Sequence, residues 1–473
     1  MAARRSKTDA ELPFRLSALG MPGELEPVVR QCVRELEEDG VRGKALRRLF
    51  GRLADDPGSF ADHPVLGRLA VMLSGKPEPS RPARKAPTVS RPAAEAPWRA
   101  WGEDLDPKAV QQMRDGCSLP VAVEGALMPD AHVGYGLPIG GVLAVDNAVI
   151  PYGVGMDIAC RMKMSVFPVS PGLLESHEAD LVRAIEEETC FGVGGKFRAR
   201  KDHPVMHEDW GFSPVTARMR DTAWAQLGTS GAGNHFVEWG VLDVPGDVSG
   251  LVAGAYLALL SHSGSRGTGG EVAKHYSALA RRLRPELPRE LGHLAWFDLD
   301  SGPGREYWAA MELMGRYSAA NHALIHGAVA ARLGLVPLWG VENHHNFAWK
   351  EVHGGREVIV HRKGATPAGA GVLGVIPGTM IHPAYVVEGL GNPRSLCSAA
   401  HGAGRAMSRQ EALKRFRRGD LEHALRESGV RLLSGGLDEA PMAYKDITAV
   451  MAAQGDLVRI RATFTPRIVK MAP

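Results

Sequence analysis

The sequence has few of the features that mark an exported, membrane-spanning or disulfide-rich protein. Its 473 residues include only five cysteines, and no two of them form a Cys-x-x-Cys pair, which argues against a disulfide scaffold or a zinc ribbon. No long run of apolar residues occurs, and the opening residues, MAARRSKTDAELPF, are charged without an apolar stretch. We therefore expect a protein of the reducing cytoplasm, with no membrane partner.

A strong excess of one charge is also missing. Lysine and arginine number 56 and aspartate and glutamate 53, a formal net charge of +3, so bulk charge does not identify a nucleic-acid binder. Gly195-Lys196 is followed by Phe197, which excludes a P-loop NTPase at this position. No lysine precedes x-Asp-Gly, the motif of lysine-type nucleotidyl ligases. A covalently bound nucleotide would need another residue to carry it.

Three regions differ in composition. Residues 24–53 have apolar positions at helical spacing, which predicts a small helical N-terminal appendage over residues 1–75. Residues 76–100 contain six prolines and six basic residues, a composition typical of a flexible linker. Residues 101–473 alternate short apolar runs, bounded by Gly and Pro, with helical stretches such as 172–188, 305–333 and 408–428. This pattern predicts a single large α+β domain.

The first segment with chemical potential is MPDAHVGYGLPIGGVLAVDNAVIPYGVGMDIACR, residues 128–161. Asp157 and Cys160 follow a glycine-rich turn three residues apart, so a carboxylate and a thiolate could face one metal ion. A buried cysteine beside a turn-capping aspartate would give the same pattern.

Histidines follow apolar runs in three further segments. LGTSGAGNHFVEWG contains His235, SHSGSRGTGG contains His262, and VENHHNFAWKE contains His344 and His345. A single histidine of this kind is commonly structural, but three at the ends of strand-like runs favour a shared site. With Asp157 and Cys160 they exceed the four ligands of one tetrahedral zinc, which indicates two metal ions that could clamp a phosphoryl group.

CSAAHGAGRAMSR, residues 397–409, places His401 before a glycine-rich turn. Backbone amides of such a turn can hold phosphate oxygens, and an imidazole there could attack phosphorus. Arg362 and Lys363 in VHRKGATPAGAG add positive charge, which indicates an anion site or a solvated basic turn.

Taken in order, these motifs resemble the RtcB family of GTP-dependent RNA-splicing ligases. The resemblance covers roughly residues 120–473 and rests on MPDAHVGYGLPIGG, GVGMDIAC, LGTSGAGNHF, HSGSRG, HHN, HRKGA, IPGTM, GLGN, HGAGRAMSR, DEAPMAYKDI and the late Lys470. It implies an RtcB-like fold for this region and RNA with 3′-phosphate or 2′,3′-cyclic phosphate and 5′-hydroxyl ends as the partner.

The resemblance also implies roles for individual residues. Two Mn²⁺ ions would be held by Asp157, Cys160, His235, His262 and His345, and His401 would carry GMP from GTP. The positions that match the family's nucleotide pocket are Asn234, His235, Phe236, Val237, Glu238, His345, Asn346, Pro377, Gly378, Thr379, Met380, Ala384, His401, Gly402, Ala403, Gly404, Tyr444 and Lys470.

Elementary chemistry fits several of these implied roles. Glu238 could accept from guanine N1 and N2, Lys470 could donate to O6, and Phe236 and Tyr444 offer rings on which a base could stack. The implied reaction is guanylylation of His401, transfer of GMP to an RNA 3′-phosphate, and attack by a 5′-hydroxyl, in tRNA splicing or RNA repair.

The sequence departs from the family pattern at three positions. Thr379 and Ile381 stand in the segment where GSMG is expected, and Arg161 replaces a glycine after the ligand cysteine, where we expect it to bring charge near the metals. Two other functions compete with the ligase. A metal-dependent phosphoesterase or end-processing paralogue would keep the metal residues without needing His401 or Lys470, and a non-catalytic RNA-binding protein would tolerate loss of metal ligands.

Overall fold

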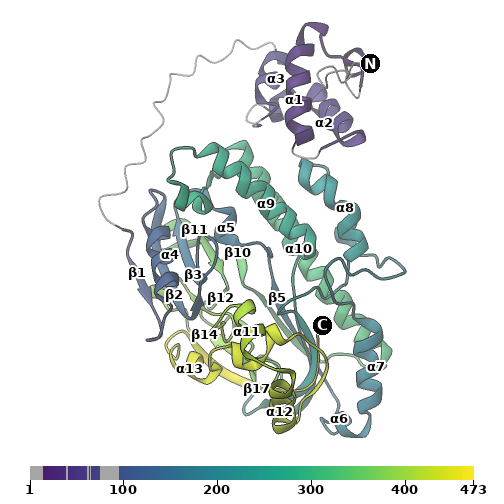
Figure 1. Ribbon diagram of the computed structural model, residues 1–473, viewed down its shortest axis with the longest axis vertical. Coiled ribbons are helices and arrows are strands. Elements are labelled where there is room, and N and C mark those ends of the chain that lie inside the picture. Colours follow the sequence, from purple (N-terminus) through teal and green to yellow (C-terminus); the bar gives the residue numbers. More distant parts are fainter. Residues whose placement is uncertain (1–13, 39–40, 61–62, 64, 75–94) are drawn as a thin grey trace, which may run out of the picture.

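The computed structural model describes residues 14–38, 41–60, 63, 65–74 and 95–473 (Figure 1). Within these residues the chain is a mixed α+β protein with one large domain, which confirms the predicted fold class. The proline-rich segment that predicts a linker lies outside the described residues up to position 94. The linker and the separateness of the N-terminal helices therefore stay predictions.

The larger sheet has eight strands and is almost closed on itself. All its neighbouring pairs are antiparallel except the parallel pair of β16 with β17. Its strands, in spatial order, are β13 (Leu373–Ile376), β14 (Ala384–Gly389), β17 (Val458–Met471), β6 (Phe236–Val244), β7 (Gly254–Ser263), β5 (Arg161–Phe167) and β9 (Trp339–His344), with β16 (Arg431–Ser434) beside β17. The Asn343 side chain of β9 donates to Val375 O of β13 at 3.3 Å and accepts from Val375 N at 2.8 Å, so an amide side chain links the two end strands.

Side-chain alternation divides this sheet into two faces. Met164, Leu260 and Phe464 pack together on the inner, concave side. Trp239 lies on the opposite side, in a cluster with Ile325 of the long helix α10. Because successive strand residues point to opposite faces, the strand position of a residue decides whether it faces the interior or the helices.

A second sheet has five strands, in the order β1 (Trp98–Ala100), β2 (Ala122–His132), β3 (Ile139–Val145), β11 (Arg356–Lys363) and β10 (Asn346–His353). Two small sheets pair β12 (Ala365–Pro367) with β15 (Ser398–Ala400) and β4 (Ala148–Val149) with β8 (Phe297–Asp298). The chain passes from the larger sheet to the second within His344, His345 and Asn346, so this segment lies at the junction of the two sheets.

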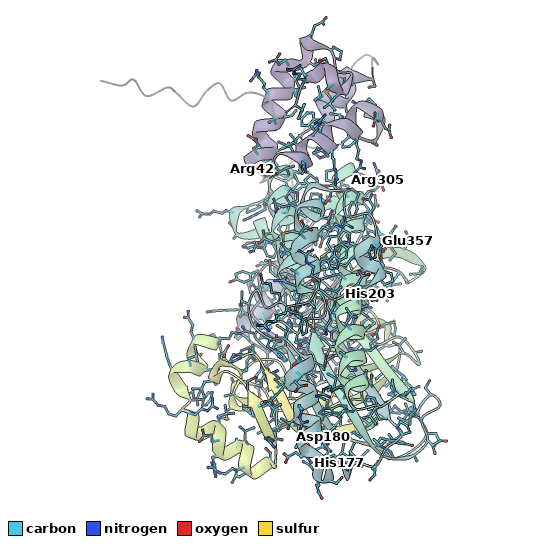
Figure 2. The ribbon with its side chains drawn as sticks, turned by 90° about the vertical axis from the view of Figure 1, so that its right-hand side faces the viewer. Arg42, His177, Asp180, His203, Arg305 and Glu357 are labelled. Atoms are coloured by element: carbon cyan, nitrogen blue, oxygen red, sulfur yellow. The ribbon has the colours of Figure 1, made fainter. Side chains whose placement is uncertain are left out.

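The helices cover these sheets on the outside. They are α4 (Pro107–Cys117), α5 (Pro151–Val154), α6 (Leu173–Ser176), α7 (Glu178–Glu188), α8 (Pro214–Gln226), α9 (Arg266–Leu283), α10 (Gly302–Arg332), α11 (Arg409–Arg415), α12 (Arg418–Ser428) and α13 (Ile447–Ala452). Ser301 caps α10 by accepting from Gly304 N at 3.1 Å. Apolar and small residues surround α10 on most sides, so it is buried along its length. Figure 2 shows this span: Arg305 in its first turn and Asp180 of α7, a helix that contacts α10, lie far apart along the molecule.

The N-terminal helices are α1 (Glu26–Glu38), α2 (Lys44–Asp55) and α3 (Gly67–Leu73). Val29, Leu46, Phe50 and Leu69 belong to one cluster of buried side chains that these helices share. The five-stranded sheet begins before residue 101, where the sequence predicts the start of the large domain. Its strand β1 pairs in parallel with β2, and Gly125 N donates to Pro97 O at 2.9 Å.

Candidate active site

Three histidines and one cysteine converge where the inner face of the larger sheet meets the junction of the sheets. His262, near the end of β7, donates from Nδ1 to Asn234 O at 3.0 Å, which leaves its Nε2 lone pair free. That Nε2 lies 3.1 Å from Cys160 Sγ and 3.2 Å from His345 Nε2. Cys160, His262 and His345 thus form one group of converging donor atoms.

A second group shares the same cysteine. His235 Nε2 lies 3.0 Å from Asp157 Oδ2 and 3.4 Å from Cys160 Sγ. In each group the candidate ligand atoms all lie within 4.8 Å of one another. The structure therefore brings together all five predicted metal residues, and it favours His345 over its neighbour His344. We call these five residues the donor cluster: Asp157, Cys160, His235, His262 and His345.

The protonation states suit a cation. Burial lowers the pKa of His262 to about 3 and lowers the pKa of His235 and of His345, so the imidazoles are neutral near pH 7. Burial raises the pKa of Asp157, but hydrogen bonding to His235 and the Arg266 charge outweigh it, and the pKa ends below its ordinary value. Burial, followed by the Asp157 charge, raises the pKa of the Cys160 thiol. A bound divalent ion would favour the thiolate.

Local backbone geometry places Asp157 and Cys160. Asp157 Oδ1 accepts from Ser265 N at 2.9 Å, at the N-terminus of α9. A Cβ on Gly264 would lie 2.2 Å from that oxygen, so only glycine fits there. Ala159 has φ +55°, an uncommon conformation for alanine, and its N–H donates to Asn346 O at 2.7 Å. Strain beside Cys160 is thus compensated by contact with the segment that carries His345.

A buried hydrogen-bond chain supports the cluster from the other face of the sheet. His322 Nε2 must donate to Ser263 O at 3.1 Å, because a carbonyl only accepts. His322 Nδ1 therefore accepts from the Ser261 hydroxyl at 2.7 Å, and Ser261 accepts from His326 Nε2 at 2.8 Å. Ser165 then donates to His326 Nδ1 at 2.8 Å. This directed chain ties β5 and β7 to α10 on either side of His262.

His401 follows β15 and lies beside the donor cluster, with its ring centroid 4.9 Å from that of His345. Its Nδ1 donates to Asp130 Oδ2 at 2.7 Å, and its backbone N–H donates to the same oxygen at 3.2 Å. Asp130 is fully buried. The carboxylate holds the hydrogen on Nδ1 and leaves the Nε2 lone pair available for attack.

The glycine turn after His401 fits closely against Asp130. Gly404 has φ +72°, and a Cβ there would lie 2.1 Å from Asp130 O. Only glycine satisfies both conditions. The turn that follows His401 and the residue that orients its imidazole are therefore packed as one unit.

One cavity unites the donor cluster, His401 and most of the predicted nucleotide residues. The predicted residues that line it are Asp157, Cys160, Asn234, His235, Phe236, Glu238, His262, His345, Asn346, Pro377, Gly378, Thr379, Met380, Ala384, His401, Gly402, Ala403, Gly404 and Tyr444. Burial raises the pKa of Glu238 well above its ordinary value. Two hydrogen bonds donated by a ligand would favour the ionised carboxylate at this position and lower its pKa.

Val237 and Lys470 are not brought to the cavity. They pair with each other across β6 and β17, on the face opposite to that of Glu238 and Val469. Lys470 Nζ instead donates to Glu186 O at 3.2 Å and lies 5.7 Å from the Phe191 ring centroid. Strand alternation therefore directs the Lys470 ammonium toward α7.

Tyr444 lines the cavity but has a partner on its ring. The Arg405 guanidinium lies 5.0 Å from its ring centroid, and the Tyr444 hydroxyl hydrogen-bonds to Glu439. Arg409 also pairs with Glu439, at 2.8 Å. A stacked base would have one face of Tyr444 at most.

Sequence reasoning missed several residues in and around this cavity. Arg405, Arg409 and Glu439 line it. Asp130 and Arg266 are hydrogen-bonded to the predicted His401 and His235. All five lie inside the motifs that carry the family resemblance. The motifs could have identified them. Their partners could not be deduced from the sequence, because Asp130 and His401 are 271 positions apart.

Arg161 lies close enough to Cys160 for the two groups to interact electrostatically, but its guanidinium contacts other partners than the donor atoms. Its Nη1 lies 2.9 Å from Glu342 Oε1, and its Nη2 donates to Gly315 O of α10 at 3.4 Å. Consecutive residues of an extended chain point to opposite faces of a sheet. Arg161 therefore points toward α10, whereas Cys160 points toward His262. Thr379 keeps its hydroxyl 2.7 Å from His382 Nδ1, at the cavity wall.

The site combines carboxylate, thiol and imidazole donors, which can bind metal ions, with an oriented histidine beside them. This combination is typical of a metal-dependent enzyme. A family model described as tRNA-splicing ligase RtcB matches residues 112–213 and 207–471. RNA-splicing ligase RtcB of Escherichia coli strain K12 is 34% identical over 396 residues, covering 77% of this chain and 95% of that protein. RNA-splicing ligase RtcB of Mycobacterium tuberculosis is 31% identical over 433 residues, covering 75% and 98%. The chain therefore belongs to the RtcB family of RNA ligases.

None of the helices in the described part of the chain is long and apolar enough to cross a membrane.

Proposed function

We propose that this chain joins RNA 3′-phosphate or 2′,3′-cyclic phosphate ends to 5′-hydroxyl ends, using GTP and Mn²⁺, through GMP bound covalently to His401. The observation that carries this proposal is the oriented His401 imidazole in one cavity with the donor cluster. The reaction would serve tRNA splicing or RNA repair in the cytoplasm.

In the first step His401 Nε2 attacks the α-phosphorus of GTP. A nitrogen–phosphorus bond forms, the bond to the β-phosphate oxygen breaks, and pyrophosphate leaves. The imidazole becomes positively charged, and the buried Asp130 carboxylate at Nδ1 stabilises that charge. Amides of the turn after His401 are available to the phosphate oxygens.

GMP then passes from His401 to the RNA 3′-phosphate, whose oxygen attacks the same phosphorus. The 5′-hydroxyl of the second RNA attacks the activated 3′-phosphate, and GMP leaves. A cyclic phosphate must first be opened by water. The residues that would hold two Mn²⁺ ions are Asp157, Cys160, His235, His262 and His345. The carboxylate and the imidazoles suit Mn²⁺, whereas the thiolate suits Zn²⁺ or Co²⁺ equally. When bound, the ions would supply charge stabilisation for the phosphoryl oxygens.

The proposed guanine contact is Glu238. Its buried carboxyl group lies in the cavity wall, where it could accept from N1 and N2 of guanine, and adenine does not present that pair of donors. Phe236 lies on the same face and offers a ring beside the base. The proposed contact rests on Glu238 and leaves out Lys470, whose ammonium lies on the opposite face of the sheet.

Labelling with α-labelled GTP and Mn²⁺ tests the proposal. The wild-type protein should take up a covalent label that is acid-labile and alkali-stable, as expected of a phosphoramidate, and His401→Ala should take up none. Equal labelling of His401→Ala and wild type would contradict the assignment of the nucleophile. Opening of cyclic phosphates without any labelling of the wild type would favour a phosphoesterase instead.

A further inference from the structure

Two exposed basic segments lie on either side of the turn 231–234, which supplies Asn234 to the cavity. The first segment, which we call the basic loop, is residues 196–201, KFRARK. It contains Lys196, Arg198 and Arg200. The second, the basic helix segment, is residues 409–418, RQEALKRFRR, with five basic residues and one acidic residue. It comprises α11 and the junction to α12.

The backbone connects the basic loop to the turn. Gly192 N donates to Gly231 O at 2.7 Å, and Ser230 N donates to Cys190 O at 2.9 Å, just before the basic loop. A Cβ on Gly231 would overlap the Arg266 guanidinium, which itself donates to His235 Nδ1 at 3.0 Å. The basic loop thus follows a segment fixed against the donor cluster.

The basic helix segment reaches the other side of the same turn. Arg409, its first residue, lines the cavity, and a Cβ on Gly233 would lie 2.6 Å from the Arg409 guanidinium. Lys414, Arg415 and Arg417 follow on the exposed surface of α11 and the junction. Positive charge therefore continues from the cavity wall to the outside.

Six of these cations have no ion-paired carboxylate among the described residues, whereas Arg409 pairs with Glu439 and Arg418 pairs with Glu422. Among the described residues no carboxylate is ion-paired with Lys196, Arg198 or Arg200, and none with the side chains of Lys414, Arg415 or Arg417. Several exposed cations elsewhere have such partners, namely Lys274 with Glu271, Arg316 with Glu208, Arg332 with Glu187 and Arg356 with Asp146. Asp202, the acidic residue next to the basic loop, is hydrogen-bonded to His207 at 2.9 Å.

Apolar groups accompany the charges. Val193 beside the basic loop is 97% exposed, and Leu413 on α11 is 54% exposed. Phe197 lies under Lys201, and Phe416 lies beside Arg415. Cations interleaved with aromatic and apolar side chains are typical of surfaces that follow a nucleic-acid strand.

We propose that the basic loop and the basic helix segment bind the phosphate backbone of single-stranded RNA where it leaves the cavity on its two sides. This inference rests on the proposed function for its choice of RNA over other polyanions. A ligase must hold two strands whose ends meet in one cavity, and each strand must continue outward from that cavity. The two segments supply uncompensated charge on two sides of one turn.

The test uses full-length protein and a single-stranded RNA oligonucleotide with a 3′-phosphate, without GTP. Two triple variants neutralise each segment: Lys196→Gln with Arg198→Gln and Arg200→Gln, and Lys414→Gln with Arg415→Gln and Arg417→Gln. The matched control is Lys274→Gln with Arg281→Gln and Arg289→Gln, which removes the same charge from the exposed surface of α9 and the segment after it.

The salt dependence of RNA affinity is the measurement. Three lost phosphate contacts should lower the slope of log affinity against log salt by about 2, since each contact in a single strand contributes about 0.7. Between 50 and 200 mM salt, wild type should therefore lose about 20-fold more affinity than either variant, and the control should behave as wild type.

A slope equal to that of the control in either variant overturns the proposal, and so does tighter salt-dependent binding of an acidic peptide of equal charge. Labelling with GTP distinguishes a failure of the proposed RNA path from a failure of the proposed function. All three variants should label as wild type does, because the neutralised side chains lie outside the cavity. A wild type that binds RNA with the expected slope but never labels would contradict the proposed function and leave the RNA path supported.

Discussion

Replacing Asp130 by asparagine should slow guanylylation of His401 while leaving the donor cluster intact. Asp130 Oδ2 accepts two hydrogen bonds from His401, from Nδ1 at 2.7 Å and from the backbone N–H at 3.2 Å. Asparagine keeps the shape but removes the charge. Its amide can also face Nδ1 as a donor, which would move the hydrogen to Nε2 and block the attacking lone pair.

The expected size follows from the hydrogen bond. A bond to a charged partner contributes about 1.5–3 kcal/mol, and each 1.36 kcal/mol changes a rate about tenfold, so the rate should fall roughly 10- to 150-fold. The assay is the single-turnover rate of covalent labelling at saturating GTP and Mn²⁺. Asp146→Asn, which alters an exposed carboxylate paired with Arg356, is the control and should label at the wild-type rate.

Metal binding supplies the second readout. Asp130 belongs to neither donor group, so the Mn²⁺ affinity of Asp130→Asn should equal that of wild type. The reasoning is refuted if Asp130→Asn labels within about twofold of the wild-type rate. It is also refuted if the loss of labelling is fully explained by a loss of Mn²⁺ binding.

Three other outcomes are expected. Cys160→Ala should abolish Mn²⁺ binding and labelling, because Cys160 is the donor shared by both groups. The control Cys190→Ala should bind Mn²⁺ as wild type does. Retained Mn²⁺ binding in Cys160→Ala would contradict the two-ion interpretation. Gly404→Ala should lower the free energy of unfolding by at least about 1–2 kcal/mol, because alanine is strained at φ +72° and its Cβ would collide with Asp130 O. A denaturant titration measures this change. Unchanged stability would show that the turn can move. Removal of residues 1–94 should leave labelling intact, because the five-stranded sheet begins at β1, and a folded but inactive product would show that the N-terminal region belongs to the active domain.

Much of the fold class and of the site could be predicted because the signals are local. The helical spacing in residues 305–333 predicts the buried α10, and the apolar run of residues 251–260 predicts most of β7. Histidines that follow apolar, strand-like runs predicted a shared site. The geometry of the two donor groups agrees with that prediction.

What could not be predicted depends on register and on long-range contacts. Lys470 lies one residue from Val469, and that single step directs it to the other face of β17. The helical stretch 408–428 is two helices, because the chain breaks at Phe416 and Arg417, where Asp420 accepts from Arg417 N at 2.7 Å. The partner of Asp130 is likewise set by tertiary structure alone.

The central claim is that His401 serves the transfer of GMP, whereas the donor cluster serves the joining of strands. A ligation assay with RNA that already carries GMP on its 3′-phosphate tests it most directly, because this substrate bypasses the first two steps. His401→Ala should seal the activated RNA to a 5′-hydroxyl strand, whereas His262→Ala should not. Failure of a folded, Mn²⁺-binding His401→Ala to seal it, or sealing by His262→Ala at the wild-type rate, would contradict the account.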